Sequence, residues 1–318
     1  MAGLLANKDV LSMEDFDRKT IERVLEVAVG MERAVKTRSC LDLCRGRILA
    51  TMFFQPSTRT RLSFEAAMQR LGGSVIGFAD PGSTRAAKGS FYEEGLKDTI
   101  KVVQTYSDVI VIRHYESGAA ARAAGYADIP VLNAGDGTNE HPTQCLLDLY
   151  TMWRLQGRLD GMAIALVGDL TIRAMRSLTL GLSHFDSKVY LVSPPEQRSN
   201  LNMLDRPNIK AKFLEVTSID EVLPEVDVVY IVAIKNSPDI SLVGRGREGI
   251  TPTEYQLSPE KLRVTRDNLC VLSPLPRSDE LPIEVDEFPQ AKYFDQAFYG
   301  MVVRMALLAM VFDRDGLF

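Results

Sequence analysis

Short apolar runs alternate with helix-patterned stretches along most of this chain, and this rhythm constrains the fold more than any other feature. Gly46–Phe54 is nearly continuous in apolar residues, as strands buried on both faces of a parallel sheet are. Similar runs follow at Ser74–Phe78, Val109–Ile112, Pro130–Leu132, Ala163–Val167, Lys188–Val192, Val226–Val232 and Leu269–Leu272. The alternation of strand and helix predicts an α/β fold with parallel sheets.

Helical spacing of apolar residues marks the two ends and the middle of the chain. It occurs in Ser12–Thr37, with Ser12 as a candidate cap, and again in Gln296–Phe312. Pro142–Gln156 is expected to be a helix that joins two sheet domains. The length agrees with two domains, because 318 residues is about twice the usual size of one domain.

Charge and composition exclude several classes of protein. A net charge of -5 argues against a protein that binds nucleic acid through a basic face. No stretch approaches the roughly 18 uncharged apolar residues that cross a bilayer, and the first apolar run lacks the preceding basic residues of a signal peptide. The 4 cysteines form no zinc-site pattern, so we expect reduced thiols. The sequence therefore predicts a cytoplasmic protein with no nucleic-acid or membrane partner.

A compact polar motif, Pro56-Ser-Thr-Arg-Thr-Arg61, stands between a predicted strand and a predicted helix. The N-terminus of a helix offers unpaired N–H groups and a partial positive charge, which favour an anion. Three hydroxyls and the planar fork of Arg59 would add donors suited to phosphate oxygens. The alternative is a capped helix with surface arginines, but the density of donors behind a strand favours a phosphate site. Since the chain lacks GxxxxGK[ST], a P-loop is not indicated.

Three blocks of sequence resemble signatures of the aspartate/ornithine carbamoyltransferase family. FFQPSTRTRLSFEAAMQRLGG, which contains the polar motif, is similar to the carbamoyl phosphate signature. NAGDGTNEHPTQCLLD resembles the second signature, in its aspartate carbamoyltransferase version, and Pro274-Leu-Pro-Arg277 with Ser278-Asp-Glu280 resembles the third. The blocks stand in the family's order and spacing, and the likeness covers nearly the whole chain. It implies an enzyme that moves the carbamoyl group of carbamoyl phosphate to a small amine, with no metal and no cofactor.

The resemblance implies a role for each residue around the reacting carbonyl group. The phosphate would be held by four adjacent residues, Ser57, Thr58, Arg59 and Thr60. Arg113, at the end of a predicted strand, would reach both the phosphate and the carbonyl oxygen, and His141 would donate to that oxygen. The implied catalytic group is thus Arg59, Thr60, Arg113 and His141, because negative charge builds on the carbonyl oxygen as phosphate leaves.

The carbamoyl nitrogen has its own implied contacts. Gln144 matches the family residue that touches this nitrogen, and the backbone carbonyls of Pro274 and Leu275 would accept hydrogen bonds from it. The resemblance also implies a cis bond between Leu275 and Pro276, although only about one X–Pro bond in twenty is cis in folded proteins.

The acceptor half departs from the aspartate pattern. The arginine and glutamine that the aspartate branch carries after a strand correspond here to Ala233 and Lys235. Alanine cannot clamp the side-chain carboxylate of an acceptor, and a buried carboxylate needs a cation. Arg173 still matches the residue that binds the α-carboxylate, and Leu275 also lines the implied acceptor site. The missing charge would come from Lys235, Arg85, Arg245 or Arg247, or else the acceptor is not aspartate.

Lys88 lies in Ser83–Gly89, a stretch similar to a mobile loop of the family. In the family this loop reaches into the active site of a neighbouring subunit, where the lysine contacts the acceptor. The resemblance therefore implies a homotrimer with active sites shared between subunits. The sequence leaves the presence of a regulatory subunit open.

The expected organisation is a carbamoyl phosphate-binding domain at 1–133 plus 292–318 and an acceptor-binding domain at 134–291. Each would be a parallel sheet flanked by helices, with the active site in the cleft between them. L-aspartate is the first expectation for the acceptor, giving N-carbamoyl-L-aspartate for pyrimidine biosynthesis. A different small amino acid or amine, and a catalytically silent homologue that acts as an assembly partner, are the alternatives. A Rossmann dehydrogenase is not supported, because Val167–Leu170 lacks the G-x-G-x-x-G turn.

Overall fold

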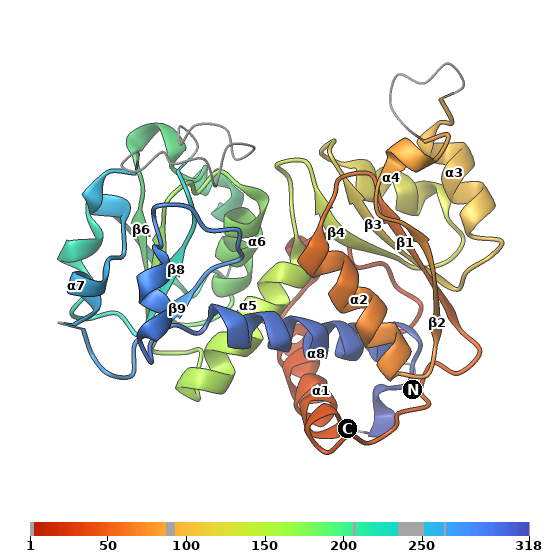
Figure 1. Ribbon diagram of the computed structural model, residues 1–318, viewed down its shortest axis with the longest axis horizontal. Helices are drawn as coiled ribbons and strands as arrows, with labels where there is room; N and C mark the ends of the chain where they lie inside the picture. The colour runs from red at the N-terminus through yellow and green to blue at the C-terminus, as the bar shows by residue number, and fades with distance from the viewer. Residues whose placement is uncertain (1–2, 87–92, 206–207, 235–250, 264, 318) are drawn as a thin grey trace. The chain divides into compact units, whose positions relative to one another are not determined.

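The computed structural model describes residues 3–86, 93–205, 208–234, 251–263 and 265–317, and the chain divides into two compact units (Figure 1). Unit 1 consists of Met1–Tyr150 and Ala297–Phe318, and unit 2 of Thr151–Gln296. Each unit is built on a parallel sheet flanked by helices, which confirms the predicted α/β class. The predicted limits of the two binding domains, near 133 and 291, stay a prediction; the compact units divide at 150 and 296.

The sheet of unit 1 has the strand order β2-β1-β3-β4, with every neighbouring pair parallel. Its strands are β1 (Ile48–Phe53), β2 (Ser74–Phe78), β3 (Val109–His114) and β4 (Val131–Asp136). The central strands β1 and β3 are almost wholly buried, as their continuous apolar runs predicted, whereas β2 at the edge is largely exposed.

Helices of unit 1 cover this sheet and its ends. They are α1 (Arg18–Lys36), α2 (Thr58–Arg70), α3 (Leu96–Val103), α4 (Ala119–Tyr126), the first part of α5 (Pro142–Gln156) and most of α8 (Tyr293–Val311). The predicted start of the first helix at Ser12 is wrong. Ser12 caps a short 3-10 turn, Met13–Asp15, while the side chain of Asp17 accepts a hydrogen bond from Thr20 N at 2.7 Å and caps α1 itself.

The sheet of unit 2 has the order β7-β6-β5-β8-β9, again parallel throughout. Its strands are β5 (Ala163–Val167), β6 (Lys188–Val192), β7 (Lys212–Val216), β8 (Val228–Ile231) and β9 (Cys270–Leu272), and its helices include α6 (Arg173–Leu182) and the short α7 (Pro259–Leu262). The sequence did not predict β7, because the charged residues Lys212 and Glu215 leave this edge strand without a continuous apolar run.

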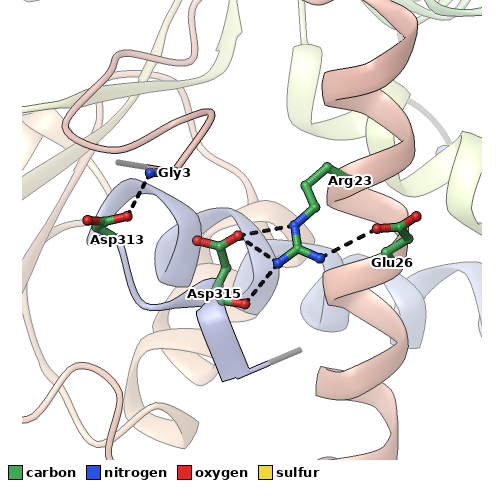
Figure 2. Close-up of polar contacts among 5 residues, drawn as sticks. All are labelled: Gly3, Arg23, Glu26, Asp313 and Asp315. Carbon is green, nitrogen blue, oxygen red and sulfur yellow. Dashed lines mark hydrogen bonds and ion pairs between the residues drawn. The ribbon is translucent and has the colours of Figure 1, made fainter. Parts of the chain in front are cut away.

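The two ends of the chain are tied to the body of unit 1 by polar contacts (Figure 2). Gly3 N donates to Asp313 Oδ1 at 2.8 Å. Arg23 on α1 donates from Nη2 to both the backbone oxygen and Oδ2 of Asp315, each at 3.0 Å, and a longer ion pair of 3.4 Å joins it to Glu26. The turn after α8 is thereby fixed on α1, close to the N-terminal residues (Figure 2).

Within the described residues, α8 is the helix that is long and apolar enough to cross a membrane by length and composition. Its most apolar window has a mean hydropathy of 1.3, and 67% of that window is buried inside the protein. A core helix has the same properties, and α8 contributes buried residues such as Val302 and Leu308 to the interior.

The four cysteines are free thiols, as predicted: Cys40 is exposed, and Cys44, Cys145 and Cys270 are buried. Burial raises the pKa of the Cys44 thiol to about 12 and raises the pKa of Cys270 as well. The Cys44 and Cys270 thiols are therefore protonated near neutral pH and are poor nucleophiles.

Candidate active site

The strand order in unit 1 reverses between β1 and β3, which lie side by side in the sheet (Figure 1). From β1 the chain passes through α2 to β2 on one side, and from β3 it passes through α4 to β4 on the other. Open α/β sheets bind ligands at such a point, beyond the carboxyl ends of the strands. The predicted phosphate-binding residues follow β1, and Arg113 lies near the end of β3, so both lie at this position.

The N-terminus of α2 forms the predicted phosphate cradle. The helix begins at Thr58, and Ser57 is its N-cap in an extended conformation, but the Ser57 side chain makes no capping hydrogen bond. The N–H groups of the first turn are therefore not occupied by this hydroxyl and can face an anion. Ser57 is half-buried, Thr58 is exposed, and Thr60 is buried with 5% of its surface exposed.

The arginines of the cradle have different environments. Desolvation lowers the pKa of the Arg59 guanidinium from its ordinary value, although the residue as a whole is exposed to solvent. A partly desolvated cation interacts more strongly with an anion than one fully in water does. Arg61 instead forms an ion pair with Glu65 at 3.1 Å within α2, and Glu65 also accepts a hydrogen bond from Thr51.

Arg113 lies next to the cradle because of the strand register. Phe53 on β1 pairs with Arg113 on β3, and Phe54 N donates to Arg113 O at 2.8 Å. The half-buried guanidinium of Arg113 donates from Nη1 to Ala134 O at 3.2 Å, on the neighbouring β4. The fold therefore brings together, at one edge of the sheet, two predicted phosphate-binding segments that are distant in sequence.

The loop between β4 and α5 positions His141. Asp136 anchors this loop, because its carboxylate accepts hydrogen bonds from Gly118 N at 2.7 Å and from Asn133 Nδ2 at 2.9 Å. Glu140 accepts from Met13 N at 2.9 Å and ties the loop to the N-terminal segment. His141 follows directly, is 5% exposed, and has Nδ1 3.4 Å from the hydroxyl of Thr143. This histidine is therefore held by a rigid loop at the start of a buried helix.

Gln144, in the first turn of α5, has a partner that was not predicted from the sequence. Its Nε2 donates to Oδ1 of Asp148 at 2.9 Å, and Asp148 is fully buried. The signal was present in the sequence, since residues four apart on a helix face each other and Gln–Asp pairs use this spacing.

Unit 2 has its own point of strand reversal, between β5 and β8. Arg173, predicted to bind an α-carboxylate, is the first residue of α6 and follows β5 by a short turn. Asp169 fixes that turn by accepting hydrogen bonds from the backbone and hydroxyl of Thr171 at 2.9 and 2.6 Å. Ala233, half-buried, follows the end of β8. The two predicted acceptor positions thus follow neighbouring strands.

Pro274 and Leu275 follow β9 in unit 2. The predicted cis bond between Leu275 and Pro276 is confirmed, and Leu275 has a positive φ of 53°. Leu275 N donates to Ser273 Oγ at 3.1 Å, and Ser273 N donates to Gln296 Oε1 at 3.0 Å. The turn that carries the two predicted carbonyl acceptors is therefore held by side chains that the sequence did not single out.

Further along the same segment, Glu280 is a fully buried carboxyl group. Burial raises its pKa to about 7, against the opposing effect of backbone hydrogen bonds. Ser278 N donates to Glu280 Oε2 at 2.9 Å. The chain after PLPR thus contains a group that titrates near neutral pH.

Several predicted acceptor residues lie outside the described residues: Lys88, Lys235, Arg245 and Arg247. Arg85, the remaining candidate for the missing charge, is described and exposed. The structure consequently describes all of the predicted donor residues but only part of the predicted acceptor set.

Comparison with known proteins gives one consistent family. Residues 8–154 match the aspartate/ornithine carbamoyltransferase carbamoyl-P binding domain, and residues 160–311 match the Asp/Orn binding domain of that family. The aspartate carbamoyltransferase catalytic subunit of Thermococcus onnurineus is 47% identical over 309 residues, covering 95% of this chain and 96% of the relative. That of Methanocaldococcus jannaschii is 43% identical over 320 residues, covering 97% and 99%.

Solved structures give the same result. The aspartate transcarbamoylase of Trypanosoma cruzi in complex with carbamoyl aspartate and phosphate superimposes with a TM-score of 0.87 at 36% identity, covering 98% of this chain and 97% of that one. The same enzyme with carbamoyl phosphate and aspartate gives a TM-score of 0.86 at 36% identity, covering 98% of each chain.

Proposed function

This chain belongs to the aspartate/ornithine carbamoyltransferase family, and from that premise we propose that it transfers the carbamoyl group of carbamoyl phosphate to the amino group of L-aspartate. The products are N-carbamoyl-L-aspartate, a precursor of pyrimidines, and inorganic phosphate. The observation that carries the proposal is the position of the α2 cradle and Arg113 together at the strand reversal of unit 1.

The reaction needs little covalent participation from the protein. The uncharged amine attacks the carbonyl carbon, the new N–C bond forms as the bond to the phosphate oxygen breaks, and the amine loses a proton. Ser57, Thr58, Arg59 and Thr60 bind the phosphate in this proposal, and Arg59 offsets charge on the leaving group. Thr60, Arg113 and His141 donate to the carbonyl oxygen as it becomes negative. Donors held by a buried helix start and a strand end need no reorganisation during the reaction, which lowers the barrier.

Aspartate as the acceptor is supported by the relatives and by Arg173. The Trypanosoma cruzi structures contain aspartate or carbamoyl aspartate. Arg173 stands at the N-terminus of α6, where its guanidinium and the partial positive charge of the helix both favour a carboxylate. The cation for the second carboxylate of aspartate is proposed to come from Lys235 or from Arg85, Arg245 or Arg247.

A different small amino acid is the second candidate acceptor, and Ala233 is the observation that favours it. This half-buried alanine follows β8 at the position where a clamp for a side-chain carboxylate is expected. An acceptor whose side chain is uncharged would not require a cation there.

Phosphate release from carbamoyl phosphate across a panel of amino acids tests the proposal. The panel includes aspartate, ornithine, asparagine and small neutral amino acids, and release without an acceptor is subtracted. We expect the highest kcat/KM with aspartate. A higher value with another amine would establish the second candidate, and acceptor-independent release alone would contradict carbamoyl transfer.

A homotrimer with shared active sites is part of the same proposal. Its support is the resemblance of Ser83–Gly89 to the family loop and the name "catalytic subunit" that the relatives carry. Light scattering should give a mass about three times that of the chain. Mixing the Lys88→Ala and Arg59→Ala variants should restore part of the activity, because some sites would then combine an intact Arg59 with an intact Lys88. Absence of recovery in verified mixed trimers would contradict sharing.

A further inference from the structure

Gln144 is fixed in one orientation by a buried carboxylate. Its Nε2 donates to Asp148 Oδ1 at 2.9 Å, one helical turn further along α5. An ionised carboxylate only accepts hydrogen bonds, so the amide nitrogen, and not the amide oxygen, must face Asp148. Gln144 Oε1 therefore points away from Asp148, and it accepts no hydrogen bond from the residues that the structure describes.

A buried cation accompanies Asp148. Arg304 on α8 is 3% exposed, and burial lowers its pKa to about 10 while the attraction of Asp148 opposes this lowering. Arg304 therefore stays charged at neutral pH. The same attraction stabilises the ionised form of Asp148, which would otherwise be costly inside the protein.

Packing holds Arg304 in place. Its guanidinium carbon lies 5.1 Å from the centre of the Phe64 ring on α2, a cation–π arrangement. A methyl group added to Gly300 would lie 2.7 Å from Arg304 Nη1, so the glycine leaves room for the guanidinium against α8. Arg304 thus connects α8, the helix α2 that carries the phosphate cradle, and the carboxylate that holds Gln144.

This arrangement has a consequence for the choice of donor substrate. A carbamoyl group carries an NH2 that donates to an amide oxygen, whereas an acetyl group has a methyl of similar size that cannot donate. Binding the methyl would remove water from the Gln144 oxygen without giving it a hydrogen-bond donor, which is unfavourable. A glutamine whose amide could rotate would instead turn its nitrogen toward the substrate, and it would then no longer distinguish a carbamoyl group from an acetyl group.

We propose that Asp148, with Arg304 as its buried counter-ion, is a positioning residue that fixes the Gln144 amide so that its oxygen selects a carbamoyl group over an acetyl group. The inference rests on the proposed function, because it assumes that Gln144 meets the carbamoyl nitrogen. Asp148 acts through Gln144 and does not touch the substrate.

Equilibrium titration without an acceptor tests this, with carbamoyl phosphate, acetyl phosphate and inorganic phosphate as probes. The wild-type chain should bind carbamoyl phosphate at least about tenfold more tightly than acetyl phosphate. In Asp148→Asn, the new amide can donate to Gln144 Oε1 and let the glutamine rotate. The preference should then fall to about threefold or less, while the affinity for inorganic phosphate is unchanged. A merely structural role would weaken all three probes together and would overturn the proposal.

A double-mutant cycle tests whether Asp148 works through Gln144. In a Gln144→Met background, which has no amide to orient, Asp148→Asn should not change the carbamoyl-to-acetyl preference further. An additional loss in that background would overturn the proposal. Asp98→Asn, which removes an exposed carboxylate from α3, is the matched control and should leave every affinity unchanged.

The proposed function is checked on the same proteins by acceptor-dependent phosphate release. Suppose that the wild-type chain releases no phosphate with any amine but binds carbamoyl phosphate more tightly than acetyl phosphate. The proposed carbamoyl transfer is then contradicted, whereas the proposed selection by Gln144 is supported. If acceptor-dependent phosphate release is normal and Asp148→Asn still prefers carbamoyl phosphate over acetyl phosphate, only the positioning role of Asp148 is contradicted.

Discussion

Each of the two sheets has a point of strand reversal where a ligand can bind, but the residues that follow the strands at this point differ between the sheets. In unit 1 the strands on both sides of the reversal are followed by donors, the α2 cradle after β1 and Arg113 near the end of β3. In unit 2, Arg173 follows β5, but the described residue at the matching place after β8 is Ala233. A parallel sheet thus determines where a ligand can bind, whereas individual side chains determine which ligand it is.

Unit 1 carries the proposed contacts to the phosphate and the carbonyl oxygen, whereas unit 2 carries the proposed acceptor residues together with the backbone carbonyls of Pro274 and Leu275. The residues for carbamoyl phosphate are held by buried strands, a helix start and an anchored loop, so they are ready before the substrate arrives. The acceptor side depends on Arg173 and on a charge that the described residues do not place after β8. Variants in the two units should therefore have distinct kinetic effects.

The largest effect is expected in unit 1 from Arg59→Ala. Loss of a guanidinium from the leaving phosphate should lower kcat about 1000-fold, a barrier increase of about 4 kcal/mol. Steady-state phosphate release with aspartate measures this. Arg70→Ala removes the same charge from the exposed last turn of α2 and should leave kcat within about twofold. Near-normal turnover of the Arg59 variant would contradict the proposed role of the phosphate cradle in catalysis.

Arg173→Ala in unit 2 should act on the acceptor alone. Losing a charge-assisted hydrogen bond of about 1.5–3 kcal/mol should raise the KM for aspartate about 100-fold, while the KM for carbamoyl phosphate changes little. Initial rates with each substrate varied in turn distinguish the two constants. An equal rise in both KM values would show that the units do not divide recognition in this way.

The buried charges of the two units should also respond differently to pH. Glu280 in unit 2 has a pKa raised to about 7 by burial, so its folded form holds the proton more tightly than the unfolded chain does. Stability from this group is present below about pH 4.5 and is lost as pH rises through about 7, a loss of about 2 kcal/mol between pH 5 and 8. Arg304 in unit 1, with a pKa of about 10, does not titrate in this range.

Hydrogen exchange in β9 and in β1 at pH 5 and 8, corrected for intrinsic rates, reports the two units separately. Protection should fall with pH more in β9 than in β1. Glu280→Gln should abolish the difference, because its amide does not titrate. A pH dependence that survives in this variant would point to another group.

The smallest effect is expected from restoring a charge after β8. Ala233→Arg should lower the KM for aspartate about tenfold, since a guanidinium pairs with a carboxylate through two parallel hydrogen bonds. Ala233→Leu is the control for size and should not improve aspartate use. If the arginine variant loses activity with the natural acceptor but gains none with aspartate, the second candidate acceptor is favoured.

Much of the fold was predictable because buried parallel strands consist of continuous runs of apolar residues, which are visible in the sequence. β5 and β6 were predicted to the residue, and α5 as well. β7 was missed because two charged residues interrupt its apolar run, and the start of α1 was misplaced because Ser12 and Asp17 both have cap chemistry. Each of the two caps a different element in the structure, and cap chemistry alone does not tell which of them begins the long helix.

The sequence alone determined the parallel α/β class, the family and the chemical types at the donor site, because these depend on residues close together in the chain. The resemblance implied that Arg113 reaches the phosphate, but only the tertiary structure gave the strand register that places it there and showed that Arg304 accompanies Asp148 behind Gln144. Strand register and helix packing bring together residues far apart in sequence, and a buried charge is stable only beside its partner. No local sequence pattern indicates that Asp148 and Arg304 form a buried pair, because each residue by itself is an ordinary charged residue in a helix.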